Sequence, residues 1–68
     1  MILFKERLKE LRIEKGLTQT QLAKELRVNQ RTISNWEVGE RQPTLDTLEV
    51  IAKYFNVSYD YLLGLTDE

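Results

Sequence analysis

Four side chains between residues 30 and 35 carry hydrogen-bonding groups of the kind that recognise base pairs. They are Gln30, Arg31, Ser34 and Asn35. On a helix, where successive residues are rotated by about 100°, these four fall on one arc together with Val38. Arginine pairs with O6 and N7 of guanine, and glutamine or asparagine pairs with N6 and N7 of adenine. The spacing therefore predicts a helix whose polar face can contact base edges in a major groove.

The opposite arc of this helix predicts a buried face. It holds Thr32, Ile33, Trp36 and Glu37, including the two large apolar side chains. Trp36 allows two interpretations, base stacking or a place in the core, and its arc shared with Ile33 favours the core. An ordinary solvated helix is the alternative for the polar arc, although Glu and Lys would be more typical there. We expect the recognition helix to cover about residues 29–38.

A second, preceding helix is predicted to position this one. Thr18 and Gln21 have the spacing of a capping box, in which each side chain bonds a free backbone N–H at a helix start. Asn29 is a good N-cap for the recognition helix, and Gly39 would end it. Between the two caps, apolar residues recur at helical spacing at Leu22, Ala23 and Leu26. Two short helices joined by three or four residues describe a helix-turn-helix over about residues 18–37.

Three further helices are expected around this pair. The first runs from about residue 3 to 15, with an apolar stripe at Phe4, Leu8 and Leu11. Another follows the capping residue Thr44, and its expected buried face is Leu45, Leu48, Ile51, Ala52 and Phe55. Alternation of apolar and polar residues is absent, so no strand is predicted. The fold class is therefore all-α: a compact five-helix bundle forming one domain over residues 1–68.

The last helix, capped by Ser58, is unusually apolar. Its large side chains are Tyr59, Tyr61, Leu62, Leu63 and Leu65. Two interpretations remain open for them. All of them could close the core of the monomer, or an exposed remainder could form a small dimer contact.

Composition excludes several functional classes. The 68 residues include no cysteine and no histidine, which removes disulfides, thiolate metal sites and the commonest metal ligand and general base. We therefore expect no catalysis, no cofactor, no metal and no small-molecule ligand. No apolar run reaches the roughly 18 residues of a membrane span, and the N-terminus becomes charged at Lys5, unlike a signal peptide. No membrane partner is expected.

Charge is unevenly distributed along the chain. The formal net charge of −1 argues mildly against a nucleic-acid partner, because such domains are often basic. Residues 1–41, however, hold nine of the ten basic side chains and six of the eleven acidic ones. This portion has an excess of three positive charges and could present one face to phosphate. Ordinary mixing of surface charge explains so small an excess equally well.

At this point the sequence resembles a known family. Four motifs occur in order along the chain, with spacing that matches a known pattern without gaps: Leu-Thr-Gln-x-x-Leu-Ala from Leu17, Ile-Ser-x-Trp-Glu-x-Gly from Ile33, Pro-Thr-Leu from Pro43 and Ser-x-Asp-Tyr-Leu-Leu-Gly from Ser58. Together they resemble the Cro and phage-repressor type of helix-turn-helix, the XRE family, over about residues 4–64. The resemblance implies a lambda-repressor-like domain in which the second and third helices form the helix-turn-helix.

The resemblance also implies roles for individual residues. Base contacts would come from Gln19, Gln30, Arg31, Ser34 and Asn35, with Gln19 also bracing the recognition helix. Phosphate contacts would come from Thr18, Arg41 and Gln42, partly through backbone N–H groups. Arg12 and Glu37 occupy positions that form an interhelical ion pair in the family, which would explain an acid on the inner arc.

Arg27 departs from the family pattern, which often places glycine in this turn. Arginine in a left-handed conformation would cost on the order of 1 kcal/mol. We therefore expect a turn slightly different from the usual one. Arg27 is a further candidate for a phosphate contact.

The function implied is sequence-specific binding of a double-stranded DNA operator by a transcriptional regulator, either a repressor or a Cro-like switch. The resemblance implies a homodimer on DNA and a bacterial or phage-encoded protein of the cytoplasm, associated with the nucleoid. The alternative is a protein-interaction module, such as an antitoxin, that uses the same scaffold.

Overall fold

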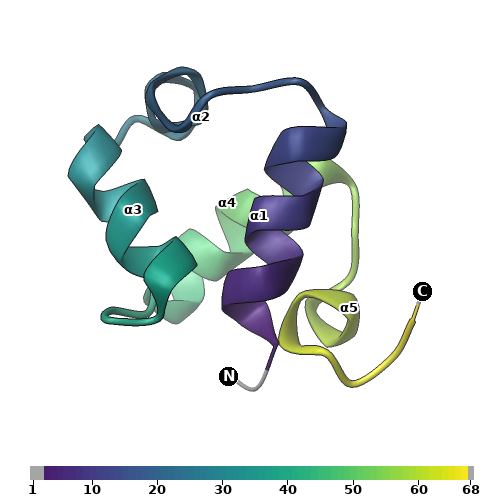
Figure 1. The fold of residues 1–68 in the computed structure, drawn as a ribbon. Helices are drawn as coiled ribbons and strands as arrows, with labels where there is room; N and C mark the ends of the chain where they lie inside the picture. Colours follow the sequence, from purple (N-terminus) through teal and green to yellow (C-terminus); the bar gives the residue numbers. More distant parts are fainter. Residues whose placement is uncertain (1–2, 68) are drawn as a thin grey trace.

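Five helices follow one another along the chain in the computed structural model, which describes residues 3–67 (Figure 1). They are α1 (Phe4–Glu14), α2 (Gln19–Leu26), α3 (Gln30–Val38), α4 (Leu45–Phe55) and α5 (Tyr59–Leu63). Over the described range there is no strand, which confirms the predicted all-α architecture. None of these five helices is both long and apolar enough to cross a membrane.

All five helices contribute buried side chains to the core. Helix α1 lies between α3 and α5, while α2 packs against α3 and α4 against α5 (Figure 1). Each helix contributes one of the five largest fully buried side chains: Leu8, Leu22, Ile33, Ile51 and Leu62. Burying such a side chain stabilises the fold by about 1.5–3 kcal/mol relative to leaving it exposed. Because each helix holds one of these side chains, displacing any helix would open the common core.

Polar N-caps begin four of the helices, as the sequence predicts. Side-chain oxygens of Thr18, Asn29, Thr44 and Ser58 each accept a hydrogen bond from a backbone N–H in the first turn that follows. At Thr18 the bonding is reciprocal, since its own N–H donates to Gln21 Oε1 at 2.8 Å. A cap of this kind contributes about 1 kcal/mol. Local hydrogen bonds therefore fix where these four helices start.

The predicted buried face of α4 is correct in its middle and wrong at its start. Leu48, Ile51 and Ala52 are buried, but Leu45 is 81% exposed. Leu45 is the first residue of α4. At the end of the chain, Leu62 closes the core whereas Tyr59 and Leu65 remain exposed.

The turn between α2 and α3 has the left-handed residue that the family pattern requires. Arg27 adopts φ 60° and ψ 41°, and the N–H of Val28 donates to Ala23 O at 2.9 Å. The expectation that arginine would alter the turn is therefore wrong. Burial of Leu26 on one side and packing of Val28 on the other hold the chain in this conformation despite its local cost.

Replacing Arg27 with glycine should raise the free energy of unfolding by up to about 1 kcal/mol, because glycine enters the left-handed region without a Cβ clash. The matched control is Lys24→Gly, an exposed right-handed position within α2. That variant should lose about 0.5–1 kcal/mol. Urea unfolding measures both values. Equal destabilisation by the two substitutions would contradict this account of the turn.

Candidate nucleic-acid interface

Helix α3 separates its side chains as the two predicted arcs require. Ile33 and Trp36 are buried at 0% and 5% exposure, so Trp36 belongs to the core. On the other side Gln30, Arg31 and Val38 are exposed, and Ser34 and Asn35 are half-buried. Gly39 ends the helix in a left-handed conformation with φ 82°. The polar arc thus lies on the outside of the domain.

A bidentate ion pair ties α3 to α1. Arg12 Nε donates to Glu37 Oε2 at 2.7 Å, and Arg12 Nη2 donates to Glu37 Oε1 at 3.1 Å. The side chain of Glu37 is 3% exposed and that of Arg12 is 13% exposed. Arg12 Nη1 also donates to the carbonyl of Leu17 at 2.8 Å. The pair implied by the resemblance is therefore present, and it joins α1, α3 and the approach to α2.

Gln19 extends this ion pair to the exposed start of α3. Its Nε2 donates to Glu37 Oε1 at 3.0 Å, and its Oε1 accepts from Gln30 Nε2 at 2.6 Å. The structure thus brings Gln19 and Gln30 together at the outer surface. We name this series of contacts the Glu37–Gln19–Gln30 chain.

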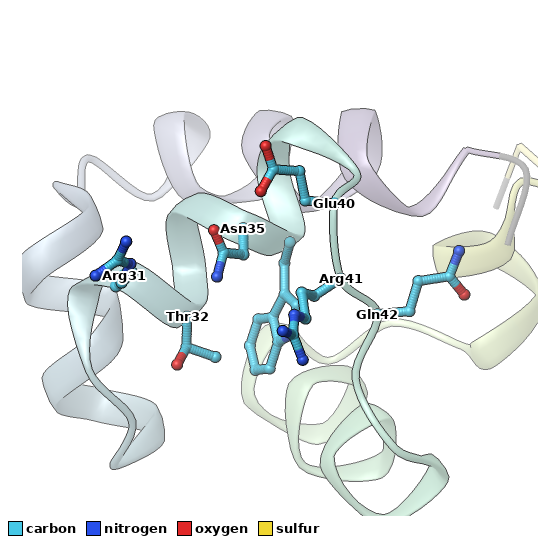
Figure 2. A pocket seen from close by; sticks show the side chains of 7 residues that line it. Arg31, Thr32, Asn35, Glu40, Arg41 and Gln42 are labelled. Carbon is cyan, nitrogen blue, oxygen red and sulfur yellow. The ribbon is translucent and has the colours of Figure 1, made fainter.

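A surface notch of about 540 Å³ lies between α3 and the loop that leads to α4. Figure 2 shows the side chains that line it: Arg31, Thr32, Asn35, Trp36, Glu40, Arg41 and Gln42. The loop is held by Asn35 O, which accepts from the N–H of Glu40 at 3.0 Å and from that of Arg41 at 3.4 Å. We call this concavity the α3–α4 notch.

Two guanidinium groups of the notch are available to an anion. Over residues 3–67, neither Arg31 nor Arg41 forms an ion pair with an acidic side chain. The N–H of Arg41 is already bonded to Asn35 O, so this residue offers its guanidinium rather than its backbone. The Gln42 side chain extends away from α3 (Figure 2). Arg31 and Arg41 therefore give the notch the groups that suit a phosphate.

The remaining predicted contact residues lie at the two ends of α2. Thr18 is the exposed N-cap of α2, and the N-terminus of a helix is a favourable position for an anion. Arg27 is exposed at the opposite end of this helix, and among residues 3–67 no ion pair joins it to the other candidates. Sequence reasoning missed two residues of the notch, Thr32 and Glu40. Helical periodicity had placed Thr32 on the inner arc, and a loop residue such as Glu40 has no periodic signal.

Two side chains away from this surface have raised pKa values. A hydrogen bond to Tyr61 is the main cause for Arg7, and burial is the main cause for Tyr54, with Glu25 adding to it. Both groups already titrate far above neutral pH, so these shifts leave their charges unchanged under physiological conditions.

These features define a class of protein. Two short helices meet through a tight turn, and the second helix is held by its apolar side while its polar side faces outward; this is a helix-turn-helix domain. The profile of the helix-turn-helix family matches residues 8–62, and the chain belongs to this family. The predicted resemblance to XRE-type regulators is thereby confirmed.

Several known proteins are similar to this chain. The transcriptional activator BcrR of Enterococcus faecalis is 47% identical over 61 residues, covering 90% of this chain and 30% of BcrR. The transcriptional regulator ImmR of Bacillus subtilis is 44% identical over 59 residues, covering 87% of this chain and 46% of ImmR. The chain thus spans less than half the length of these two curated relatives.

A solved structure is similar over nearly its whole length. It is the P22 c2 repressor protein in complex with a synthetic operator, with a TM-score of 0.83 and 33% sequence identity. The match covers 93% of this chain and 96% of that one. The lambda-repressor-like arrangement of the helices is therefore confirmed.

Removing one partner of the Arg12–Glu37 pair should lower the free energy of unfolding by much more than the intact pair contributes to it. Glu37→Ala should lower the free energy of unfolding by about 3–5 kcal/mol, because it leaves a guanidinium without its charge partner. The double variant R12M/E37M should recover most of this loss. Glu49→Ala is the control, since its pair with Lys53 is exposed and should contribute at most about 1 kcal/mol.

Thermal and urea unfolding of the three variants provide the comparison. A double variant no more stable than Glu37→Ala would show that an uncompensated charge is not the source of the loss.

Proposed function

We propose that this chain binds double-stranded DNA with sequence specificity and acts in a transcriptional regulator, with α3 lying in the major groove. The outward polar face of α3, braced by the Glu37–Gln19–Gln30 chain, is the observation that carries the proposal. A major groove of about 12 Å width admits an α-helix. The likeness to a repressor in complex with its operator supports the same orientation.

Base choice is assigned to the polar arc of α3. Gln30 and Arg31 lead, because both are exposed at the first turn, and Ser34 and Asn35 add contacts further along the helix. Gln19 is half-buried and committed to two protein partners, so its main role is to hold Gln30. Side chains of these types discriminate between bases by about 1–3 kcal/mol for each good bidentate pair.

Affinity and register are assigned to phosphate contacts on both sides of α3. Thr18 and the start of α2 form one contact region, and Arg41 with Gln42 in the α3–α4 notch forms the other. Arg27, at the far end of α2, would reach a more distant phosphate. Such contacts release counterions and make binding depend steeply on salt concentration.

Two copies of the chain are expected on one operator. Half-sites read by helix-turn-helix dimers lie about 34 Å apart, one helical turn of DNA. The longest dimension of the domain is 28 Å, so two copies fit side by side on one face of the duplex. We infer a homodimer on DNA, working in the cytoplasm on nucleoid DNA. The relatives carry the names of transcriptional regulators, and we infer that this chain binds DNA rather than catalysing a reaction.

Selection of bound duplexes from a random pool tests the function, together with the mass of the protein–DNA complex. The expected result is a two-fold symmetric consensus bound by two copies. A salt titration of the selected complex separates DNA binding from the protein-interaction alternative. Affinity should fall by orders of magnitude as salt rises if phosphates are contacted, whereas an apolar protein contact would change little.

Alanine at Gln30 or Arg31 should weaken operator binding by roughly 1–3 kcal/mol and relax preference at particular base pairs only. The reason is that each substitution removes base-edge contacts and leaves phosphate contacts in place. Binding of wild-type and variant proteins to single-base operator variants measures the effect. Glu49→Ala, on the exposed side of α4, is the control and should change neither affinity nor preference. Unchanged preference in both α3 variants would overturn the assignment.

Arg41→Ala should weaken binding to all sequences alike and reduce the slope of log affinity against log salt by about one. A phosphate contact carries no sequence information, so the order of preferred operators should stay the same. Titrations at several salt concentrations, on the consensus and on a scrambled duplex, provide the measurement. Loss of discrimination between these duplexes would instead place Arg41 against a base.

A further inference from the structure

We propose that Glu37 determines which base Gln30 selects, by fixing through Gln19 the direction in which the Gln30 amide is turned. Glu37 is nearly buried and would not itself touch DNA. It acts as a positioning residue at a distance of two hydrogen bonds. The inference rests on the proposed DNA-binding function and adds a specificity determinant to it.

The Glu37 carboxylate fixes the direction of the Gln19 amide. A carboxylate paired with a guanidinium accepts hydrogen bonds and has no proton to donate. Its Oε1 accepts from Arg12 Nη2 at 3.1 Å and faces the Gln19 amide at 3.0 Å. Gln19 must therefore turn its NH₂ group toward Glu37, because its carbonyl oxygen would meet a second acceptor there.

Gln19 in turn orients the amide of Gln30 at the surface. With its NH₂ facing Glu37, Gln19 presents its carbonyl Oε1 outward, and that oxygen can only accept. Nε2 of Gln30 donates a hydrogen bond to this oxygen at 2.6 Å. The Gln30 amide is thus turned by an acceptor that lies two hydrogen bonds away.

The contact with Gln19 leaves some hydrogen-bonding groups of the Gln30 amide free for a partner. One N–H of its NH₂ group is used by Gln19, which leaves the other N–H as a donor. Its carbonyl Oε1 has no hydrogen-bond partner among residues 3–67. One donor beside one acceptor matches adenine, which offers N7 as acceptor and N6–H as donor in the major groove.

The reversed direction would favour another base. If Gln19 turned its carbonyl inward, its NH₂ would face Gln30, whose carbonyl would then be occupied as the acceptor. Gln30 would present the two N–H groups of its amide outward. Guanine offers two acceptors, O6 and N7, and suits that arrangement. The Glu37 carboxylate excludes the arrangement with the Gln19 carbonyl turned inward. A neutral amide at position 37 could accept or donate, and it would permit both directions of the Gln19 amide.

The test uses Glu37→Gln, which keeps the shape of the side chain and replaces the carboxylate with an amide. The operator position read by Gln30 is first located as the one where Gln30→Ala relaxes preference. At that position wild-type protein should prefer adenine to guanine by on the order of tenfold or more. In Glu37→Gln this ratio should fall to within about threefold, because both directions of the Gln19 amide are then permitted.

Arg12→Lys is the matched control. It disrupts the bidentate ion pair and lowers stability, yet it keeps the carboxylate that orders the amides. Its adenine preference should remain close to that of wild type at a temperature where all three proteins are folded. A folded Glu37→Gln with the wild-type ratio, or an Arg12→Lys that loses the ratio equally, would overturn the proposal.

A measurement on the free wild-type protein is independent of both DNA and folding of the variants. The two side-chain NH₂ protons of Gln30 should differ in the temperature dependence of their NMR shifts, with one proton showing the small coefficient of a hydrogen bond. Equal, solvent-like coefficients would overturn the amide order. Absence of any base preference in wild type would instead defeat the proposed function, while the NMR result would still decide the direction of the amides.

Discussion

The ion pair between Arg12 and Glu37 is the constraint on which the orientation of α3 depends. Burial of Ile33 and Trp36 attaches α3 to the core, but the hydrophobic effect has no preferred direction. A bidentate guanidinium–carboxylate contact does have a fixed geometry. With both side chains largely removed from solvent, this contact defines how far α3 is rotated about its axis and therefore which residues face outward. Gln30 and Arg31 are outside because Glu37 is inside.

The small net charge of the chain limits how much general electrostatic attraction could contribute to the proposed binding of DNA. At −1 overall, the domain cannot rely on a large positive field, so attraction to phosphate must come from a few well-placed groups. We propose Thr18 with the start of α2 and the two arginines of the α3–α4 notch as these groups. On the proposed function, weak general attraction would also limit binding to unrelated DNA and leave a larger share of the affinity to base contacts.

Features that depend on neighbouring residues could be predicted from residue type and spacing, whereas the Arg12–Glu37 pair between distant residues could be expected only from the family resemblance. The caps at Thr18, Asn29, Thr44 and Ser58 are local hydrogen bonds, and each was predictable from residue type and spacing. Leu45 was misassigned because periodicity identifies a helix face without showing where its covering partner ends. The local cost of a left-handed arginine at Arg27 does not decide the shape of the turn, since tertiary packing of Leu26 and Val28 fixes it in spite of that cost. The direction of the Gln19 amide follows only from a contact between α2 and α3.

The most direct measurement is a crystal structure of the chain bound to a duplex selected from a random pool. The account predicts α3 in the major groove, with the Gln30 amide and the Arg31 guanidinium within about 3 Å of base edges. It also predicts the guanidinium of Arg41 against the sugar–phosphate backbone. A complex in which α3 lies outside the groove, with neither Gln30 nor Arg31 touching a base, would contradict it.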